Sequence, residues 1–255
     1  MGDREAVMAE IRRCRAEGKT RPSFGADALT VAEAYEVQIA FARERERAGD
    51  PIVGYKLGLI SPAKQRQMNV AEPIVGHLHR SMLFDPGEPV PRSRFIQPRV
   101  EPELGLVFDR DVTGSAPSAQ ELAGAVAYAI LAVDILDSIY GGYQFGAADV
   151  VADNASGGAA VIGSRPLPVD VLWDGGGRLR LALDGGPWAS GTVADLGDTA
   201  GLLEWAARQI ASMGRGIRAG DVLLLGAPCA AVLLGEASML AAEGPLGSRL
   251  VAAVV

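Results

Sequence analysis

Two glutamates, Glu101 and Glu103, occupy alternate positions of the segment RVEPELGLVF, which has the composition of a β-strand. Alternate residues of a strand point to the same face, so we expect the two carboxylates to lie side by side, separated by Pro102. Carboxylates this close repel each other unless a positive charge lies between them, and Mg²⁺ or Mn²⁺ accepts such oxygen ligands. The pattern suggests a divalent-metal site. Two solvated side chains on an exposed strand face are the alternative.

A third carboxylate, Asp134, stands in the middle of the apolar run LAVDIL at 131–136. A charged side chain in a buried strand needs a partner. A second strand that contributes Asp134 would complete a set of three carboxylates around a cation. Backbone amides that satisfy Asp134 locally are the alternative, and the spacing leaves both open.

The elements that must position these side chains are mainly strands after residue 50. Because proline cannot donate to a sheet ladder, Pro102 predicts that its strand lies at an edge, a strand end or a bulge. We expect a mixed, strand-rich α+β fold, with a helical N-terminal region at 1–50 and a β-rich catalytic domain at 51–255. The patterns predict helices at 3–17, 30–48, 61–68, 118–129 and 199–213, and strands at 52–60, 99–108, 131–138, 159–163, 178–184, 221–226 and 249–255.

Composition excludes several classes of protein. The chain has 255 residues, of which 49% are hydrophobic and 22% charged, so it is long enough to bury a full core. A net charge of −7 without a basic stripe argues against nucleic acid as a partner. The longest apolar stretch, at 125–133, is too short to span a bilayer, and the N-terminus lacks the apolar core of a signal peptide. Cys14 and Cys229 lie far apart. We expect a soluble cytoplasmic protein without membrane contact.

Three blocks, in order, resemble one family. They are GYKLGLISPAKQRQMNVAEPIVGHL at 54–78, IQPRVEPELGLVF at 96–108, and AVDILDS with VVADNASGGAAVIG between 132 and 163. They resemble the 2-oxo-4-pentenoate hydratases and 4-oxalocrotonate decarboxylases of the fumarylacetoacetate hydrolase superfamily, from about Leu29 to the C-terminus. Three spaced blocks in order are far more specific than any one of them.

The resemblance implies a twisted β-roll-like domain and a lyase of aromatic catabolism that uses Mg²⁺ or Mn²⁺. The substrate would be a small 2-oxo or 2-hydroxydienoic acid whose C1 carboxylate and 2-oxygen bind the metal, which stabilises a dienolate as a Lewis acid. It also implies a homo-oligomer or a complex with a lyase of the same pathway. The implied metal ligands are Glu101, Glu103 and Asp134; the catalytic positions are Lys56 and Asp137; the substrate-binding positions are Ser61, Asn154 and Ser156.

Several positions depart from the family's pattern. Asp134 is one methylene shorter than the usual Glu. Ile139 stands where Arg is common, which predicts a missing cation and a substrate that has fewer carboxylates or is larger and less polar. His79 replaces a usual Thr and is a candidate general acid or base. Leu225 occupies a place where Ser or Thr is common. These changes put the substrate in doubt more than the metal or the fold.

The type of reaction stays open at this point. Residues 63–70 and 149–154 favour a decarboxylase slightly over a hydratase. A carbon–carbon hydrolase or tautomerase of the same superfamily, with His79 as base, is another reading. The last hypothesis is that the chain is a degenerate homologue, which serves as a partner subunit of an active lyase.

Overall fold

The structure is a computed structural model that describes residues 4–61, 65–66, 70–112, 114, 116–173, 175 and 177–255. Two sheets and five helices organise this part of the chain. The helices are α1 (Arg4–Glu17), α2 (Val31–Arg47), α4 (Ala119–Ala125), α5 (Ala147–Ala152) and α6 (Thr199–Ser212). The strands are β1 (Ile52–Gly58), β2 (Ile74–His79), β3 (Leu83–Phe84), β4 (Arg99–Phe108), β5 (Val126–Leu136), β6 (Gly157–Ile162), β7 (Arg178–Leu183), β8 (Ala189–Thr192), β9 (Val222–Leu224), β10 (Val232–Leu233), β11 (Met239–Glu243) and β12 (Arg249–Ala253).

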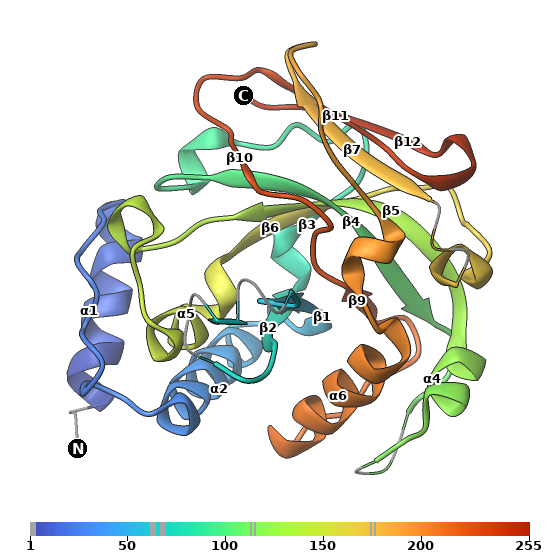
Figure 1. Cartoon of the computed structure of the whole chain (residues 1–255). Coiled ribbons are helices and arrows are strands. Elements are labelled where there is room, and N and C mark those ends of the chain that lie inside the picture. The colour runs from blue at the N-terminus through green and yellow to red at the C-terminus, as the bar shows by residue number, and fades with distance from the viewer. Residues whose placement is uncertain are drawn as a thin grey trace.

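The larger sheet is mixed and has the order β2-β1-β9-β4-β5-β6-β3, with β10 paired to β4. The smaller sheet has the order β12-β11-β7-β8. Figure 1 shows β4, β5 and β6 arching over β1 and β2, with the smaller sheet above them, α1, α2 and α5 at one end, and α4 and α6 at the other. The expected mixed, curled α+β architecture is confirmed.

Local sequence signals explain where the helices begin. Helix α2 starts at a capping box in which the Thr30 hydroxyl accepts from the Glu33 N–H and the Glu33 carboxylate accepts from the Thr30 N–H. Helix α4 starts at the same device, made by Ser118 and Glu121. Helix α4 then stops at Ala125, where β5 begins, so the helix predicted to run to residue 129 is too long by one turn. The helix predicted at 61–68 falls largely on residues 62–64 and 67–69, outside the described residues.

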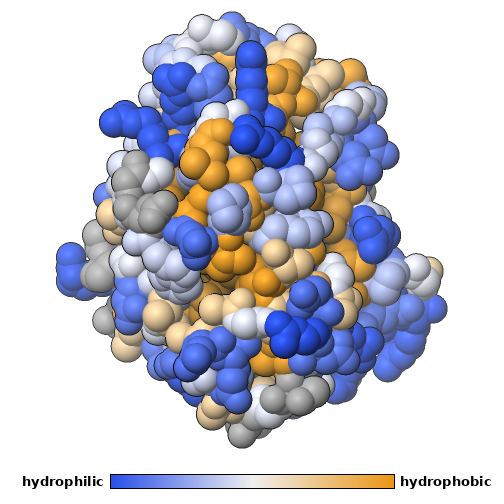
Figure 2. All heavy atoms as spheres, turned by 90° about the vertical axis from the view of Figure 1, so that its right-hand side faces the viewer, coloured by the Kyte–Doolittle hydropathy of each residue, from blue (hydrophilic) through white to orange (hydrophobic). Residues whose placement is uncertain are grey.

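The cores follow the two sheets and the N-terminal helices. One cluster fills the space between the larger sheet, the smaller sheet and α6. Another joins α1, α2 and α5, and includes Val7, Val37 and Val151. On the face shown in Figure 2, apolar side chains gather in the middle and hydrophilic ones surround them. Within the described residues, no helix is long and apolar enough to cross a membrane.

Pro102 lies inside β4 of the larger sheet and not at an edge strand, a strand end or a bulge, so that expectation is wrong. Strand β4 pairs with β5 along its whole length, and Pro102 stands opposite Val133. On its other side, β4 pairs with β10 at residues 99–100 and with β9 at 105–107, so residues 101–104 have no strand partner there. A proline without an N–H is compatible with this gap. The loop that joins β9 to β10, residues 225–231, spans the same gap.

Candidate active site and metal centre

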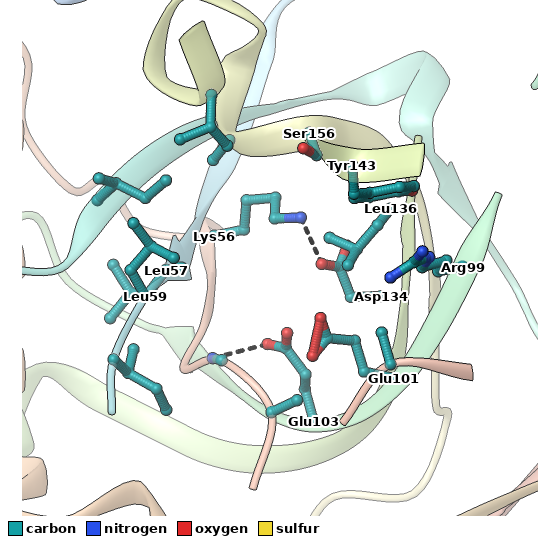
Figure 3. A pocket seen from close by; sticks show the side chains of 18 of the residues that line it. Lys56, Leu57, Leu59, Arg99, Glu101, Glu103, Asp134, Leu136, Tyr143 and Ser156 are labelled. Atoms are coloured by element: carbon teal, nitrogen blue, oxygen red, sulfur yellow. Dashed lines mark hydrogen bonds and ion pairs between the residues drawn. The ribbon is translucent and has the colours of Figure 1, made fainter. Parts of the chain in front are cut away.

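A cavity of about 290 Å³ opens among β1, β4, β5 and the β9–β10 loop. Figure 3 looks into it. Among the described residues, the charged part of its lining comprises three carboxylates and two cations, and much of the rest is apolar. The charged residues are Lys56, Arg99, Glu101, Glu103 and Asp134.

Strands β4 and β5 bring the three predicted carboxylates together. Glu101 stands directly opposite Asp134 in the antiparallel register, and Glu103 lies two residues further along β4 on the same face. All three are buried, with exposed fractions of 6% for Glu101 and 1% for both Glu103 and Asp134. Figure 3 shows their side chains turned toward the same space. The alternative of solvated glutamates on an exposed face is therefore excluded.

The β9–β10 loop closes the cavity beside Glu103. The Gly226 N–H donates a hydrogen bond of 2.8 Å to Glu103 Oε2. Gly226 has a φ of 86°, which favours glycine, and an added Cβ would lie 3.0 Å from the Ile60 side chain. Leu225, expected near the substrate, is fully buried. The backbone N–H of the next residue, Gly226, contacts the Glu103 carboxylate.

Lys56 is the cation that meets the carboxylates. It lies on β1, is only 1% exposed, and its Nζ forms an ion pair with Asp134 Oδ2 (Figure 3). The second oxygen of Asp134, Oδ1, is buried and has no hydrogen-bond partner among the described residues. A buried carboxylate oxygen without a donor is costly.

The pKa values of two of the cavity carboxyl groups are raised, mainly by burial. Burial raises the pKa of Glu103 well above its ordinary value, and the neighbouring charges of Asp134 and Glu101 raise it further. Burial also raises the pKa of Asp134, against the lowering effect of Lys56. A divalent cation would relieve both effects, and the set of carboxylate oxygens is the kind that Mg²⁺ prefers.

The donor chemistry therefore fits a divalent metal. The side chains as placed do not form a ready cage: within the described residues, no three acidic, histidine or cysteine side chains are grouped closely enough to hold an ion. Asp134 turns to Lys56 instead, and Glu103 to Gly226. Metal binding at this site would require rotation of these side chains.

Strained backbone concentrates around the same cavity. Seven residues other than glycine have a positive φ among those described, and four of them line the cavity: Leu59, Tyr143, Ala155 and Ser156. Such conformations cost free energy for residues with a side chain, and they cluster at functional sites because the surrounding structure must enforce them. This independent feature makes the cavity the candidate functional site.

The predicted substrate-binding residues lie in different places. Ser156 lines the cavity, and its buried hydroxyl has no hydrogen-bond partner among the described residues. Asn154 does not line it, because its side-chain amide bonds the backbone N–H and C=O of His77 on β2 at 2.7 and 2.9 Å. Ser61 is half-buried and lies outside the cavity lining. Only Ser156 is therefore placed to contact a substrate in the cavity.

Asp137 also lies outside the cavity, and its predicted catalytic role has no support in the geometry. Its carboxylate is buried and accepts hydrogen bonds from the Arg15 guanidinium at 2.6 Å and from the N–H groups of Ile96 and Gln97, each at 2.9 Å. Arg15 also pairs with Asp153 at 2.6 Å. Asp137 therefore ties α1 to the end of β5.

His79 is likewise outside the cavity. It is buried at the end of β2, and its Nδ1 lies 2.9 Å from the Asp50 carbonyl oxygen. Burial lowers the pKa of His79, which favours the neutral ring. The geometry gives no support to His79 as the general base of a hydrolase or tautomerase.

The position expected to lack a cation lies away from the cavity, and a different cation lines the cavity wall. Ile139 is fully buried among the N-terminal helices and does not face the cavity. Arg99 lines the cavity from β4, with its guanidinium carbon 4.2 Å from the centre of the Tyr143 ring. Sequence reasoning missed Arg99 and Tyr143. Arg99 precedes Glu101 by two positions, and strand alternation predicts that Arg99 and Glu101 share a face.

The curled mixed sheet with buried carboxylates from two neighbouring strands defines a class of enzyme, and the comparisons with known proteins identify it. The sequence profile described as fumarylacetoacetate (FAA) hydrolase C-terminal matches residues 42–250. The chain belongs to this family.

Its relatives are lyases. The chain is 36% identical over 228 residues to a 2-keto-4-pentenoate hydratase of Burkholderia vietnamiensis, a match that covers 87% of this chain and 86% of the relative. It is also 36% identical over 230 residues to a 4-oxalocrotonate decarboxylase of a Pseudomonas species, with 89% of each chain covered.

A solved structure covers the whole chain. The structure of 4-oxalocrotonate decarboxylase from Pseudomonas putida G7, complexed with magnesium and adipate, matches with a TM-score of 0.89 and 27% identity over 100% of this chain and 99% of that one. A second structure of that enzyme is complexed with calcium and acetate and has a TM-score of 0.86. The resemblance inferred from the three sequence blocks is confirmed, and the chain is an enzyme of this superfamily.

Proposed function

We propose that the chain is a divalent-metal-dependent lyase that acts on a small 2-oxo or 2-hydroxydienoic acid in the cavity. The observation that carries the proposal is the buried cluster of Glu101, Glu103 and Asp134, which strands β4 and β5 bring to one cavity. Three buried carboxylates are stable together only when a cation joins them or protons neutralise them. The magnesium and calcium in the solved structures of a relative support a metal in that role.

The residues of this chain have separate tasks in such a reaction. The three carboxylates would hold Mg²⁺ or Mn²⁺, which supplies Lewis-acid stabilisation of negative charge on the substrate's 2-oxygen. Lys56 can hold a proton at Nζ beside Asp134 or release it toward the substrate. The Ser156 hydroxyl can donate to a substrate oxygen, since no described residue occupies it. Apolar residues on the opposite wall exclude water.

A hydratase-type reaction is our first candidate for this cavity. Figure 3 shows Arg99, Glu101 and Asp134 on one side of the cavity and Leu57 and Leu59 on the other. A monocarboxylic dienoic acid would place its carboxylate among the charged groups and its hydrocarbon end against the leucines. We therefore place a hydratase-type reaction first, which reverses the slight preference for a decarboxylase drawn from residues 63–70 and 149–154. Decarboxylation remains the second candidate because of the match to the decarboxylase complexed with adipate.

One assay separates these outcomes. The purified chain with Mg²⁺ is mixed with 2-hydroxy-2,4-pentadienoate or 2-oxo-3-hexenedioate, while ultraviolet absorbance reports loss of the conjugated system and a separate assay reports CO₂. We expect loss of absorbance with the pentadienoate, abolished by a chelator and by Glu101→Gln, and retained in the exposed control Glu236→Gln. Release of CO₂ from the hexenedioate alone would favour the decarboxylase. No turnover of either acid with Mg²⁺ or Mn²⁺ would contradict the proposal.

We further propose that the chain assembles as a homo-oligomer or with a lyase of the same pathway, as its family resemblance implies. Size-exclusion chromatography with light scattering would test this, and a monomer at all concentrations, with or without the partner lyase, would contradict it.

A further inference from the structure

Arg99 is a cavity residue to which the proposed chemistry assigns no task. It is the first residue of β4, and the strand alternation puts it on the same face as Glu101 and Glu103. Successive residues on one face of a strand are about 6.6 Å apart along the chain, so Arg99 is the immediate neighbour of the carboxylate cluster. Figure 3 shows its side chain beside Asp134 and Glu101.

The Arg99 guanidinium keeps its donors available. Lys56 is paired with Asp134, and Arg15 with Asp137 and Asp153, but Arg99 is in no ion pair within the described residues. Arginine presents a planar fork of N–H donors that matches a carboxylate with two parallel hydrogen bonds. A half-buried arginine in a cavity wall is therefore suited to bind an anionic ligand.

Tyr143 restricts the orientation of Arg99. The guanidinium carbon lies 4.2 Å from the centre of the tyrosine ring, a stacking contact that arginine forms readily. Tyr143 itself is fixed in the left-handed region with a φ of 62°, and its hydroxyl donates to the Gln97 carbonyl oxygen at 3.3 Å. The fork is thus oriented before a ligand arrives, which reduces the entropy lost on binding.

The charge balance of the cavity indicates how many substrate carboxylates it accepts. Among the described lining residues, three ionised carboxylates against Lys56 and Arg99 leave one net negative charge. A divalent cation changes this to one net positive charge, which a single substrate carboxylate neutralises. A second substrate carboxylate would leave an uncompensated charge in a largely buried site, which is costly.

We propose that Arg99, oriented by Tyr143, binds the C1 carboxylate of the substrate beside the metal site and so selects 2-oxo acids with one carboxylate and an apolar tail. This assignment rests on the proposed metal-dependent lyase function. The apolar tail would extend toward Leu57 and Leu59, which face the charged side of the cavity (Figure 3).

The test is calorimetric titration of the Mg²⁺-loaded protein with 2-oxohexanoate and with 2-oxoadipate. The two acids share a six-carbon chain and a 2-oxo acid end, and they differ only in the far carboxylate. We expect the wild type to bind 2-oxohexanoate at least as tightly as 2-oxoadipate. Arg99→Gln should weaken both about tenfold or more, because a charge-assisted hydrogen bond is lost from the shared end. The exposed control Arg178→Gln should leave both affinities unchanged.

Two further variants separate recognition from folding, and the unfolding temperature of each variant is measured first. Arg99→Lys keeps the charge but loses the fork, so its affinity should lie between wild type and Arg99→Gln. Tyr143→Leu removes the ring that stacks on the Arg99 guanidinium and should weaken the binding of both acids. These variants carry the test if Arg99→Gln does not fold.

Three results would overturn the assignment. The first is wild-type affinity for 2-oxohexanoate in Arg99→Gln. The second is a loss confined to 2-oxoadipate, which would place Arg99 at the far carboxylate. The third is failure of the Mg²⁺-loaded wild type to bind either acid, which alone would also contradict the proposed lyase function.

Discussion

Replacing Lys56 with methionine would leave Asp134 buried without its ion-pair partner. Both side chains are 1% exposed, so water cannot take over the role of the ammonium. Removing one partner of a buried pair costs about 3–5 kcal/mol of unfolding free energy. Methionine preserves most of the volume of the lysine stem, so the change is mainly electrostatic.

Protonation of Asp134 sets the upper limit of this cost. A carboxyl with an ordinary pKa of 3.8 can escape a buried charge by taking up a proton. At 1.36 kcal/mol per pH unit, this costs about 5 kcal/mol at pH 7.5 but only about 1.6 kcal/mol at pH 5. Because the folded-state pKa of Asp134 is raised, the folded variant binds more protons than the unfolded chain. Its stability therefore falls as the pH rises through that interval.

The assay is thermal and urea unfolding of wild type and Lys56→Met at pH 5 and pH 7.5, with a chelator and with Mg²⁺. We expect the variant to lose about 10 °C at pH 7.5, given about 2–4 °C per kcal/mol for a chain of this size. The loss should shrink at pH 5. The double variant Lys56→Met with Asp134→Leu should recover most of it, since an apolar pair often replaces a buried ion pair without loss.

Two outcomes would refute this reasoning. A loss below about 1 kcal/mol at pH 7.5 would show that the Lys56–Asp134 pair does not stabilise the fold. An equal loss at both pH values would show that Asp134 does not titrate in the variant.

Three further predictions follow from the positions of individual side chains. Mg²⁺ affinity should fall as the pH falls, because burial raises the pKa of Glu103 and protons compete with the metal for its carboxylate; calorimetric titrations over a range of pH would detect this, and an affinity independent of pH would contradict it. Arg15→Met should lower the unfolding free energy by about 3 kcal/mol, since Asp137 and Asp153 lose their cation, while the Mg²⁺ Kd stays within about twofold; loss of Mg²⁺ binding would contradict the placement of Asp137 outside the site. His79→Gln should preserve the pH profile of turnover, because the ring faces the Asp50 carbonyl and not the cavity; loss of one limb of that profile would contradict it.

Much of the site was predictable because strand alternation is a local rule. Glu101 and Glu103 share a face for that reason alone, and the apolar run around Asp134 already demanded a partner. That Glu101 and Asp134 lie opposite each other depends on the β4–β5 register, which the sequence does not specify without the family resemblance. Arg99 obeys the same alternation, but an arginine at the start of a strand carries no signal that it faces inward.

The incorrect expectations have physical causes that act over long distances. Residues 126–129 continue a helical pattern from Ser118, yet they form the start of β5 because Val126 and Tyr128 pair with the end of β4. Pro102 predicts an edge strand, but the gap between β10 and β9 admits a proline inside the sheet. Asp137 follows the strand that carries Asp134, and its side chain forms an ion pair with Arg15, which is 122 residues away in sequence. No local sequence pattern predicts such a distant partner.

The direct test of the metal site is calorimetric titration of Mg²⁺ into wild type, Glu103→Gln, Asp134→Asn and the exposed control Glu236→Gln. The geometry predicts one ion per chain in wild type and in the control. It predicts a loss of affinity of more than about tenfold, or about 1.4 kcal/mol, in each cavity variant. Equal Mg²⁺ affinity in all four proteins, or no binding by wild type, would contradict a metal centre formed by Glu101, Glu103 and Asp134.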